Sequence, residues 1–585
     1  MATYRITFVH APARQHDQYD NALFSPLWAY ALASHVPANW DAAVADCLAD
    51  DKATIGPASV FAFSGTNQDL DSLRTVHGWL KTKYPGATFV LGGPITWSLE
   101  QEGKLELVSF FDHLFILDGE ETLPDFLRRF EQGSVDSMPK VIRGERFPLE
   151  RARPIRFDLY RKMSDRYFGA TIEVSRGCPF LCEFCDVRVL PDNNRANNKS
   201  ADLIVRELDE HFKVGVTRFL FVCDNFIGDI RWAQECVDAM LAWQQRTGAK
   251  LSIFTWTTIN IAKLPELMAK MRRVGFEVLY IGIESVNEHA LLETAKVQNR
   301  VALKPAVSKI QSFGFVIAPG FIFGFDSDVA DVFESTLSFI VDAGLIGGDP
   351  SFLMAMPGTP LFQRMQRTRR LVERGSNSTS RRKIVTNIRY LLDARFLTSG
   401  FVGFIEDLMD PRTQFARFRN HVDLVAKSVD FVATSGRSKD GSRGALRFLK
   451  LQWGSPVGRR TLFMRAAYLA RRPARALAVL RGWWLAKRAS RGGRELNLHF
   501  YFWVYAWTSL GLRYDGLRED DLSLSSVEAG FDVASLAEDG ERGPDVRMDM
   551  SQGTAKAKLQ ARYTHRALAR LAANGGAVRE AKPIE

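Results

Sequence analysis

The sequence predicts an α/β protein in three parts: a parallel sheet covered by helices, a partial (βα)6 barrel, and a mainly α-helical C-terminal extension. Three observations predict this fold class. Short apolar runs alternate with helix-length segments from residue 6 to about residue 355, which is typical of parallel strands. Three of the six cysteines lie within eight residues directly after one of these runs. Beyond residue 450, apolar residues are interleaved with many arginines, which fits helices.

The N-terminal domain is expected to span residues 1–147 and to hold a parallel sheet. Its candidate strands are a run at 6–9, a weak run at 42–45, and stronger runs at 60–64, 88–93 and 113–117. Ligands of such sheets bind at the carboxyl ends of the strands. Ser64, Gly65, Gly92 and Gly93 fall there, and small residues let a large, flat cofactor approach the backbone. We therefore assign these four residues to a candidate cofactor site. The alternative is a sheet domain that only packs against the next domain.

The barrel is expected over residues 165–372, after a linker that contains Pro148 and Pro154. Its six candidate strands are residues 170–175, 218–225, 251–256, 278–285, 318–325 and 351–355. The active sites of βα barrels are built from the loops that follow the strands. Because the cysteine-rich segment directly follows the first of these strands, it lies where an active site is expected.

Cys178, Cys182 and Cys185 follow the pattern Cys-x-x-x-Cys-x-x-Cys, which indicates a metal centre. Three thiolates give three of the four ligands of a [4Fe-4S] cubane, so one iron is left free to bind substrate. A zinc site usually needs four ligands in two separated pairs, and no second pair follows. A disulfide framework needs an oxidising compartment, whereas residues 3–9 read as a strand with no secretory signal. The remaining cysteines stand alone in apolar segments and are expected to be core residues: Cys47, Cys223 and Cys236.

The cysteine loop resembles that of the radical S-adenosylmethionine (radical SAM) family, down to Arg176 and Gly177 before the first cysteine and Phe184 before the third. The resemblance implies that the open iron binds SAM and that an electron from the cluster cleaves SAM to a 5'-deoxyadenosyl radical. It also implies a TIM-type partial barrel, open on one side to a large substrate, and an electron donor such as flavodoxin or ferredoxin. The three cysteines are thus expected to be both the metal ligands and the catalytic residues.

Polar residues at two other strand ends are candidates for holding SAM. Asp224 and Asn225 follow the second barrel strand. The resemblance implies that Glu284 and Ser285, at the end of the fourth strand, contact the ribose or the methionine end of SAM. A helix N-cap is the alternative role for Asp224, Asn225 and Glu284. Trp256 stands where related chains often have Gln or Glu, which puts the usual polar contact from the third strand in doubt.

The first domain looks like the cobalamin-binding, Rossmann-like domain of one large radical SAM subfamily, including the acidic turn at residues 118–122. Residues 320–328 and 355–362 match further hallmarks of that subfamily. The branch that this implies contains hopanoid and bacteriochlorophyll methylases. One departure is that the Asp-x-His-x-x-Gly motif, which supplies a lower axial histidine to cobalamin, is missing after Asp46. Many radical SAM relatives share this departure.

The resemblance therefore implies a cobalamin-dependent C-methyltransferase that acts on an unactivated carbon of a lipid, a tetrapyrrole or another secondary metabolite. Three cofactors are implied: a [4Fe-4S] cluster, SAM, and cobalamin as the methyl carrier. The alternative enzyme is a radical SAM rearrangement, cyclisation or oxidation enzyme without cobalamin. A non-catalytic iron-sulfur or zinc-binding protein is the alternative from another class, and it would not need the strand-end residues that accompany the cysteines.

The composition fits a chain of several water-soluble domains. The chain has 585 residues, of which 46% are hydrophobic and 25% charged, and its formal net charge is +10. No apolar run reaches the roughly twenty residues of a membrane span. We therefore expect a cytoplasmic protein, in a compartment where thiolates stay reduced.

Residues 373–522 are expected to form the helical extension, within which residues 451–494 carry eleven Arg or Lys and no Asp or Glu. A helix there, broken or kinked at Pro473, would set a basic face beside an apolar, Trp-bearing face. This is typical of peripheral contact with an anionic membrane surface, and the aromatic run 500–507 would share that interface. A helix packed on the barrel is the alternative, and nucleic acid is not expected because no binding module accompanies the charge.

The C-terminal residues 523–585 are polar and rich in Gly and Ala. A segment of this composition buries too little apolar surface to fold by itself. We expect a mostly disordered tail with one helix near residues 555–573.

Overall fold

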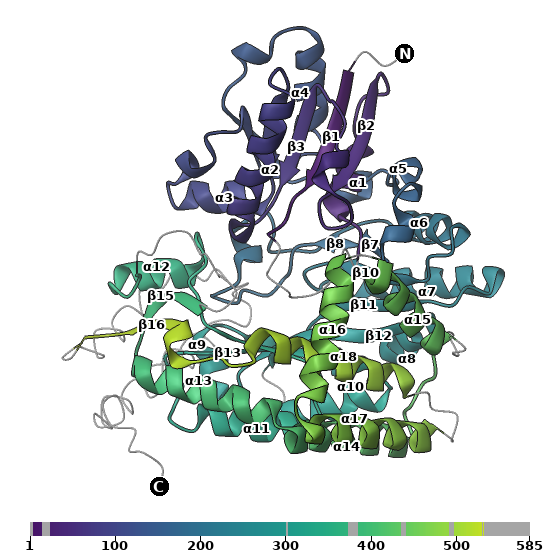
Figure 1. Cartoon of the computed structure of the whole chain (residues 1–585), viewed down its shortest axis with the longest axis vertical. Coiled ribbons are helices and arrows are strands. Elements are labelled where there is room, and N and C mark those ends of the chain that lie inside the picture. The colour runs from purple at the N-terminus through teal and green to yellow at the C-terminus, as the bar shows by residue number, and fades with distance from the viewer. Residues whose placement is uncertain are drawn as a thin grey trace.

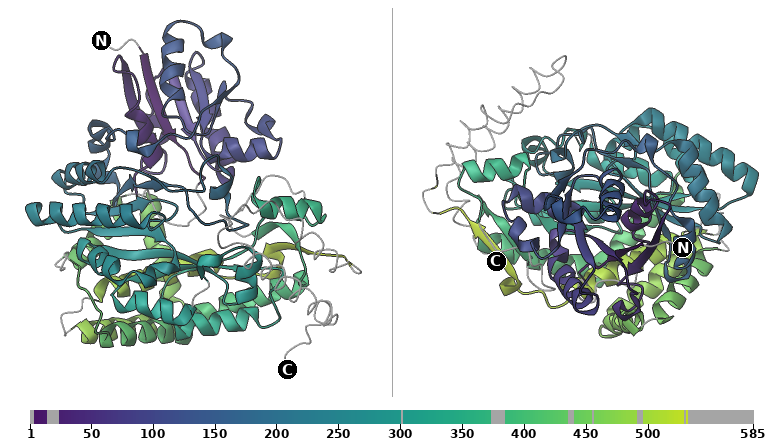
Figure 2. Two further views of the ribbon diagram at one scale, coloured as in Figure 1. Left: turned by 180° about the vertical axis from the view of Figure 1, so that it is seen from behind. Right: turned by 90° about the horizontal axis from the view of Figure 1, so that it is seen from above.

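The computed structural model describes residues 4–13, 24–299, 302–372, 384–434, 440–454, 456–490, 496–528 and 531. The N-terminal domain stands on the barrel, and the helical extension lies along the opposite side of the barrel (Figure 1). The view from behind shows the same order of the three parts (Figure 2). In this arrangement the strands of the first sheet run toward the barrel, so their carboxyl ends face it (Figure 1).

The N-terminal domain contains one six-stranded parallel sheet in the order β2-β1-β3-β4-β5-β6. Its strands are β1 (Tyr4–His10), β2 (Trp40–Asp46), β3 (Val60–Ser64), β4 (Thr88–Gly92), β5 (His113–Ile116) and β6 (Val141–Arg143). The five predicted strands are confirmed, including the weak candidate at 42–45. The sequence does not reveal β6, because a three-residue edge strand is too short to show an alternating pattern.

Helices cover both faces of this sheet. They are α1 (Leu27–Ala33), α2 (Leu70–Lys83), α3 (Pro94–Gln101) and α4 (Thr122–Glu131). Along β3, Phe61 and Phe63 face the core shared with α2 and α3, whereas Val60 and Ala62 face the core shared with α1 and α4. Both faces of the central strand are therefore apolar, as a parallel sheet between two helical layers requires.

The barrel contains six parallel strands in the order β7-β10-β11-β12-β13-β14, and its two edge strands do not pair with each other. The strands are β7 (Ala170–Glu173), β10 (Arg218–Val222), β11 (Ser252–Thr257), β12 (Phe276–Glu284), β13 (Val316–Phe323) and β14 (Asp349–Phe352). The helices between and after them are α6 (Ala201–Lys213), α7 (Ile230–Thr247), α8 (Pro265–Val274), α9 (Glu288–Glu293), α10 (Leu303–Ser312), α11 (Val332–Asp342) and α12 (Pro360–Arg367). The prediction of an open (βα)6 barrel is confirmed.

Two short elements border the barrel. Helix α5 (Phe157–Arg161) lies in the linker before it, and the strands β8 (Ser175–Arg176) and β9 (Asn197–Asn198) pair antiparallel. The β8-β9 pair closes the base of the cysteine loop, because β8 directly precedes that loop and β9 directly follows it.

The C-terminal extension is mainly helical, as predicted. Its helices are α13 (Ala394–Met409), α14 (Pro411–Lys427), α15 (Asp440–Gly454), α16 (Pro456–Ala470), α17 (Pro473–Ala489) and α18 (Asn497–Tyr514). The predicted break at Pro473 is confirmed, because α16 ends before this residue and α17 begins with it. Among the described residues, none of the helices is long and apolar enough to cross a bilayer.

A two-stranded parallel sheet in this extension corrects one expectation. Strand β15 (Ile384–Tyr390) pairs with β16 (Leu522–Ser526). The prediction of a disordered tail from residue 523 is thus wrong for residues 523–526. Local composition could not reveal this strand, since its partner lies far away in the sequence. The predicted helix at 555–573 lies outside the described residues.

The aromatic run at 500–507 places both of its tryptophans inside the extension. Trp503 and Trp507 are no more than 1% exposed, and Trp503 stacks on Phe418 of α14 with ring centroids 4.4 Å apart. Phe500 is also buried, and Tyr501 alone of these residues is exposed. The expectation that this run lies in a membrane interface is therefore wrong for Phe500, Trp503 and Trp507, whose rings are buried in the core between α14 and α18.

A buried histidine pair in this core predicts a pH-dependent stability. His421 Nε2 and His499 Nδ1 lie 2.7 Å apart, so one ring donates to the other and neither is charged. Burial lowers the pKa of His421 to about 4 and lowers that of His499 well below its ordinary value. Both rings ionise near pH 6.5 in the unfolded chain. Their contribution to stability is therefore complete above pH 6.5 and is lost as the pH falls below it.

We expect the His421→Phe variant to lose less stability than the parent chain when the pH falls from 7 to 5, by about 2 kcal/mol. Urea unfolding followed by circular dichroism at both pH values measures this difference. As a control, the same change at the half-buried His289 in α9, away from this pair, should leave the pH dependence as it is in the parent. An unchanged pH dependence in His421→Phe would contradict the account.

Candidate active site

The cysteine loop leaves the barrel through a turn that requires glycine. Gly177 has φ +87°, and a side chain there would overlap the carbonyl oxygen of Arg195. The Gly177 N–H donates to Asp224 Oδ2 over 2.5 Å, and the Cys178 N–H donates to the Asn193 carbonyl over 3.1 Å. The start of the loop is therefore anchored on two sides by backbone hydrogen bonds.

The side chains of the three cysteines lie near one another, with amide groups directed at two of the sulfurs. Asn225 Nδ2 lies 3.9 Å from Cys178 Sγ, and Gln298 Nε2 lies 3.2 Å from Cys182 Sγ. Burial raises the pKa of Cys178, and it raises the pKa of Cys185 to about 12; the charge of Cys182 adds to both shifts. Because burial disfavours bare thiolates, these sulfurs need a positive partner in order to ionise.

This donor set fits an iron-sulfur cluster. Such clusters are held by cysteine thiolates, and hydrogen bonds to the sulfurs tune their potentials. All six cysteines are free thiols. Within the described part of the chain, no three His, Cys, Asp or Glu side chains converge closely enough to bind one metal ion. A cubane does not require such convergence, because each cysteine binds a different iron.

Glu183, between the second and third cysteines, ties the loop to two distant segments. Its N–H donates to the Thr294 carbonyl over 2.8 Å, and its own carbonyl accepts from the Leu361 N–H over 3.2 Å. Its carboxylate accepts two hydrogen bonds from Arg364, with N···O distances of 2.8 and 3.0 Å. A two-point pair of this kind fixes orientation as well as charge. The middle of the cysteine loop is therefore held in place by four hydrogen bonds.

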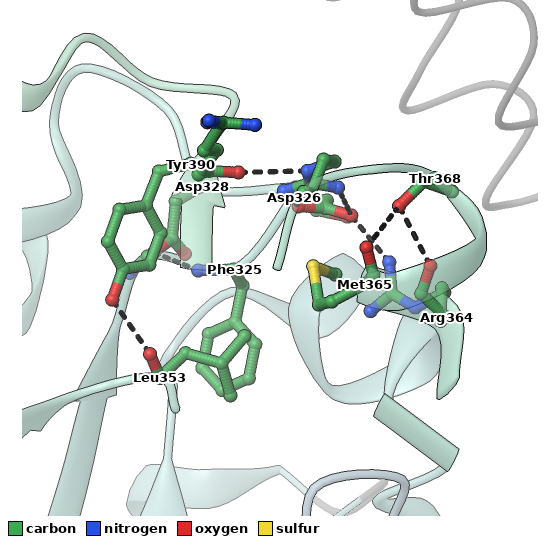
Figure 3. Close-up of polar contacts among 12 residues, drawn as sticks. Phe325, Asp326, Asp328, Leu353, Arg364, Met365, Thr368 and Tyr390 are labelled. Atoms are coloured by element: carbon green, nitrogen blue, oxygen red, sulfur yellow. Dashed lines mark hydrogen bonds and ion pairs between the residues drawn. The ribbon is translucent and has the colours of Figure 1, made fainter. Parts of the chain in front are cut away.

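The position of Arg364 gives a structural reason for the hallmark at residues 355–362. The Thr359 side chain caps α12 by accepting from a backbone N–H of its first turn. Helix α12 carries Arg364, whose guanidinium also pairs with Asp326, after the end of β13, at 2.5 Å (Figure 3). The hallmark thus begins the helix that brings an arginine to the cysteine loop.

Two carboxyl groups in this network have opposite pKa shifts. Burial raises the pKa of Asp326, but Arg370 and Arg364 outweigh this effect and bring it well below its ordinary value. Burial and the charge of Asp326 raise the pKa of Glu293 to about 8. Glu293 accepts from the backbone N–H groups of Asp326 and Ser327 over 2.9 and 2.8 Å. Near neutral pH, Asp326 is ionised between two arginines while protonation of Glu293 is favoured.

Glu284 lies at the end of β12 with φ +65°, a conformation that is uncommon for residues other than glycine. Its carboxylate pairs with Lys296 Nζ at 2.5 Å, and the two side chains are 10% and 8% exposed. Burial lowers the pKa of Lys296, but Glu284 outweighs burial and the pKa stands above its ordinary value. Ser285 is buried and accepts from the Asn287 N–H over 3.0 Å. Asn287 is the cap of α9, so the cap alternative for Glu284 is wrong.

Asp224 and Asn225 contact the cysteine loop rather than a helix end. Asp224 accepts from the Gly177 N–H, and Asn225 directs its amide at Cys178. The cap of α7 is Asp229, whose carboxylate accepts from two N–H groups of the first turn. The cap alternative is therefore wrong for both residues. The predicted contacts of SAM with the strand-end residues stay predictions.

Trp256 lies on the less buried face of the barrel sheet. It is 37% exposed and stacks on Tyr280 of β12 with ring centroids 5.0 Å apart. The alternation along β11 puts Phe254 on the same face, whereas Ile253 and Thr255 are fully buried on the other. The third strand therefore presents aromatic rings on this face, where related chains often present an amide or a carboxylate.

Ser64, Gly65, Gly92 and Gly93 lie together at the carboxyl ends of β3 and β4. Ser64 and Gly92 are register partners, and a side chain at Gly93, which has φ +86°, would overlap Ser64 Oγ. All four residues are half-buried and none carries a large side chain. This edge of the backbone fits the approach of a flat cofactor from the side of the barrel. The glycine at position 93 is also required by packing within the domain itself.

Arg176 joins the cysteine loop to the N-terminal domain. Its guanidinium lies 2.9 Å from Asp118 and 2.5 Å from Glu120, both in the acidic turn, and 2.7 Å from Glu173 at the end of β7. The Arg176 side chain is 23% exposed. The arginine before the first cysteine and the acidic turn at 118–122, two separate hallmarks in the sequence, form a single contact between the domains.

Four residues of this site could not be recognised from the sequence: Glu183, Lys296, Gln298 and Arg364. Lys296 and Gln298 are buried beside the cysteine loop, although both residue types are usually exposed. The only signal in the sequence is that they stand close together in Lys-x-Gln-Asn. A polar cluster of that kind is more often a solvated turn, so their burial had to come from the structure.

Comparisons with known proteins agree with this architecture. The profile of the Radical SAM superfamily matches residues 172–340, and a domain of unknown function (DUF4070) matches residues 359–479. An uncharacterized methyltransferase from Synechocystis sp. is 30% identical over 396 residues, which cover 66% of this chain and 71% of that protein. The hopanoid C-2 methylase of Rhodopseudomonas palustris is 36% identical over 209 residues, which cover 35% of this chain and 40% of the methylase.

A solved structure also shares the fold. The cobalamin-dependent SAM radical enzyme OxsB, with aqua-cobalamin bound, superposes with a TM-score of 0.55 at 12% identity, over 92% of this chain and 84% of that one. The predicted fold class is therefore confirmed over nearly the whole chain. The cysteine loop lies within the region matched by the superfamily profile. The chain belongs to the radical SAM superfamily of enzymes, which use a [4Fe-4S] cluster and SAM.

Proposed function

We propose that this enzyme is a cobalamin-dependent C-methyltransferase that acts on an unactivated carbon of a lipid, a tetrapyrrole or another secondary metabolite. The observation that carries the proposal is the contact of Arg176 with Asp118 and Glu120. It joins the start of the cysteine loop to the acidic turn of the first domain, so two cofactors held by these two sites would lie on either side of one domain contact. The methylase relative and the fold of OxsB support the same conclusion.

The residues divide into three groups in this proposal. Cys178, Cys182 and Cys185 hold the cluster; Asp224, Asn225, Glu284 and Ser285 hold or orient SAM; and Ser64, Gly65, Gly92 and Gly93 form the cobalamin edge. When bound, the cluster supplies an electron to SAM and cobalamin carries a methyl group. The side chains of this enzyme position these groups and shield them from water.

The aromatic face of the barrel favours an apolar substrate. Trp256, Tyr280 and Phe254 lie on the face that also carries Gly282 and Gly320, and Glu284 lies beside these glycines. Stacked rings bury apolar area and exclude water, whereas they offer few hydrogen bonds to a polar substrate. A flat or hydrocarbon skeleton therefore matches this surface better than a sugar or a peptide does.

The overall reaction has a balance that can be measured. Two molecules of SAM and two electrons convert a substrate C–H bond into C–CH3. One SAM gives its methyl group and leaves as S-adenosylhomocysteine; the other takes the substrate hydrogen and leaves as methionine and 5'-deoxyadenosine. A rearrangement or oxidation without methyl transfer would release no S-adenosylhomocysteine.

The test is turnover of the holoenzyme with SAM that carries a deuterated methyl group, in the presence of a chemical reductant and a lipid or pigment extract. We expect 5'-deoxyadenosine and S-adenosylhomocysteine in nearly equal amounts, and a product that carries the deuterated methyl. Formation of 5'-deoxyadenosine without S-adenosylhomocysteine would contradict methyl transfer. The Cys185→Ala control should form neither product. If the parent also formed neither product, the assignment of the cysteine loop would be contradicted.

The proposal includes two partners. The two electrons must come from a one-electron donor, and a small acidic redox protein such as flavodoxin or ferredoxin fits a chain of net charge +10. Contact with a membrane surface would give access to a lipid or tetrapyrrole substrate. Both partners are consistent with the chemistry of the site and with the basic C-terminal extension.

The amide of Gln298 is expected to set the potential of the cluster. Its N–H points at Cys182 Sγ. A hydrogen bond to a cluster sulfur stabilises the reduced cluster, which carries more negative charge, and so raises the reduction potential. We expect the Gln298→Leu variant to bind iron normally but to have a reduction potential lower by some tens of millivolts, at a cost of about 1 kcal/mol for the lost bond. Potentiometric titration followed by electron paramagnetic resonance measures this shift.

A matched control is Gln311→Leu, which also removes a buried amide. Gln311 donates to the Gly344 carbonyl over 3.2 Å, away from the cysteines. The potential of this control should equal that of the parent. An equal shift in both variants, or no shift in Gln298→Leu, would show that Gln298 does not act on the cluster.

A further inference from the structure

Helix α17 packs with its small residues inward and its large apolar residues outward. It buries Ala478, Gly482 and Ala486, and near its start also Arg475, whose guanidinium lies over the Tyr468 ring. A side chain at Gly482 would overlap the ring of Trp503, so the inward face has to be small. The exposed apolar residues of this helix are Leu477 at 48%, Leu480 at 63%, Trp483 at 46% and Trp484 at 57%. A helix of a water-soluble domain ordinarily has the opposite pattern.

The outward residues form a continuous stripe along the helix. Leu477, Leu480 and Trp484 are separated by three and four residues, so they lie on one face of α17, with Trp483 at its border. Helix α17 lies at the rim of the helical extension (Figure 1). An exposed stripe of two tryptophans and two leucines is far more apolar than the isolated surface residues that soluble proteins normally show.

Basic side chains flank this stripe. Arg481 lies on the same face, Lys487 Nζ lies 4.7 Å from the Trp483 ring, and Arg488 Cζ lies 5.3 Å from the Trp484 ring. Helix α17 contains no Asp or Glu. Within the described residues, none of these three basic side chains forms an ion pair with a carboxylate of the chain. The surface therefore combines apolar rings with positive charge that the protein itself does not neutralise.

We infer that the outward face of α17 docks onto a bilayer surface that carries anionic lipids. Tryptophan rings settle at the boundary between headgroups and acyl chains, and Lys and Arg beside them reach the lipid phosphates and carboxylates. Anionic headgroups complement the basic side chains. This inference identifies the surface for the membrane contact included in the proposed function, but it does not depend on the reaction that the enzyme catalyses.

A second copy of the chain fits this face less well. In a symmetric dimer the same face would meet itself, and Arg481, Lys487 and Arg488 would oppose their own copies with no carboxylate between them. Like charges placed across an interface cost several kcal/mol in such contacts. The charge on α17 therefore favours an anionic lipid surface over self-association.

Sedimentation of the full-length chain with lipid vesicles tests the inference. We expect the protein to sediment with vesicles of phosphatidylcholine and phosphatidylserine, and to remain in solution with vesicles of phosphatidylcholine alone. The triple change Arg481→Gln, Lys487→Gln and Arg488→Gln should weaken binding about a hundredfold. The double change Trp483→Ser and Trp484→Ser should weaken it at least about tenfold, because the rings supply the buried apolar area.

A control removes three exposed basic residues from the other end of the molecule, by Arg128→Gln, Arg129→Gln and Lys162→Gln. It should bind vesicles as the parent does. This result would separate the effect of the basic residues of α17 from the effect of the net charge of the chain. The inference would be overturned if the parent stayed in solution with both kinds of vesicle, or if the α17 variants bound as well as the parent. A dimer of the parent that the tryptophan variant loses, without vesicle binding, would identify a second copy as the occupant instead.

The test of vesicle binding and the test of the proposed reaction can fail independently of each other. Cleavage of SAM to 5'-deoxyadenosine in detergent-free buffer should be unchanged in the α17 variants, since α17 does not contact the cysteine loop. Loss of vesicle binding with intact SAM cleavage therefore concerns the surface alone, whereas loss of methyl transfer with intact vesicle binding concerns the reaction alone.

Discussion

Cys182→Ala is expected to abolish the iron-sulfur cluster and all cleavage of SAM. Cys182 is the most buried of the three loop cysteines, and its charge acts on both of the others. Without it, a cubane would have two protein ligands in place of three. We expect the iron content of the anaerobically purified variant to fall to background, and 5'-deoxyadenosine to fall by at least about a thousandfold, as for other removals of an essential group.

Cys236→Ala is the matched control for this change. Cys236 is also fully buried, but it lies in α7 away from the loop. The control should keep the iron content and the SAM cleavage of the parent, and lose at most about 1 kcal/mol of stability. Full iron loading in Cys182→Ala would contradict the assignment of this residue as a ligand.

Arg176→Met is expected to have the second large effect, on the docking of the N-terminal domain. The change leaves Asp118, Glu120 and Glu173 close together without their counter-charge. Breaking a buried ion pair in this way costs about 3–5 kcal/mol, and the 23% exposure of Arg176 favours the lower end of that range. We expect an earlier urea transition and faster proteolysis between the first domain and the barrel.

The effect of Arg176→Met should also depend on pH. Burial raises the pKa of Glu120, and without Arg176 the carboxylates repel one another and protonate more readily. The variant should therefore be closer to the parent at pH 5 than at pH 7. Arg143→Met is the control, because its ion pair with Glu100 lies at the surface, with the arginine 58% exposed, and contributes at most about 1 kcal/mol. Equal effects of both changes would contradict a special role for Arg176.

The strands of both sheets, except the short edge strand β6, could be predicted from the sequence because their physical cause is local. Buried parallel strands are short apolar runs between helices, and this pattern is visible at 60–64 and 218–222 without any knowledge of the fold. The cysteine loop was visible for the same reason, since its three cysteines lie within eight residues. Elements that depend on distant partners, such as β15 and β16, show no such pattern.

The contacts that hold the cysteine loop were invisible for a different reason. Glu183 and Arg364 are 181 residues apart, and each is an ordinary charged residue in its own segment. Their pairing depends on the barrel, which brings α12 next to the loop. Likewise Asp224 and Asn225 were correctly placed at a strand end, but their contacts with Gly177 and Cys178 required the register of the neighbouring strands.

For helix α17, the composition predicts two different faces but does not show which of them is buried. The sequence predicts an apolar, Trp-bearing face beside a basic face, which leaves open which face is buried. The structure buries the small residues, because the rings of Trp503 and Phe418 occupy the space where larger side chains would lie. The aromatic run of α18 thus forms the core, and the tryptophans of α17 are left on the surface.

The most direct test of the central claim is the cobalamin content per polypeptide after anaerobic purification from cells supplied with cobalamin, measured together with iron. The account predicts close to one cobalamin and one [4Fe-4S] cluster per chain, with cobalamin retained but iron lost in Cys182→Ala. Iron at full content with no cobalamin would contradict methyl transfer through cobalamin, and would leave the first domain as a scaffold for another radical SAM reaction.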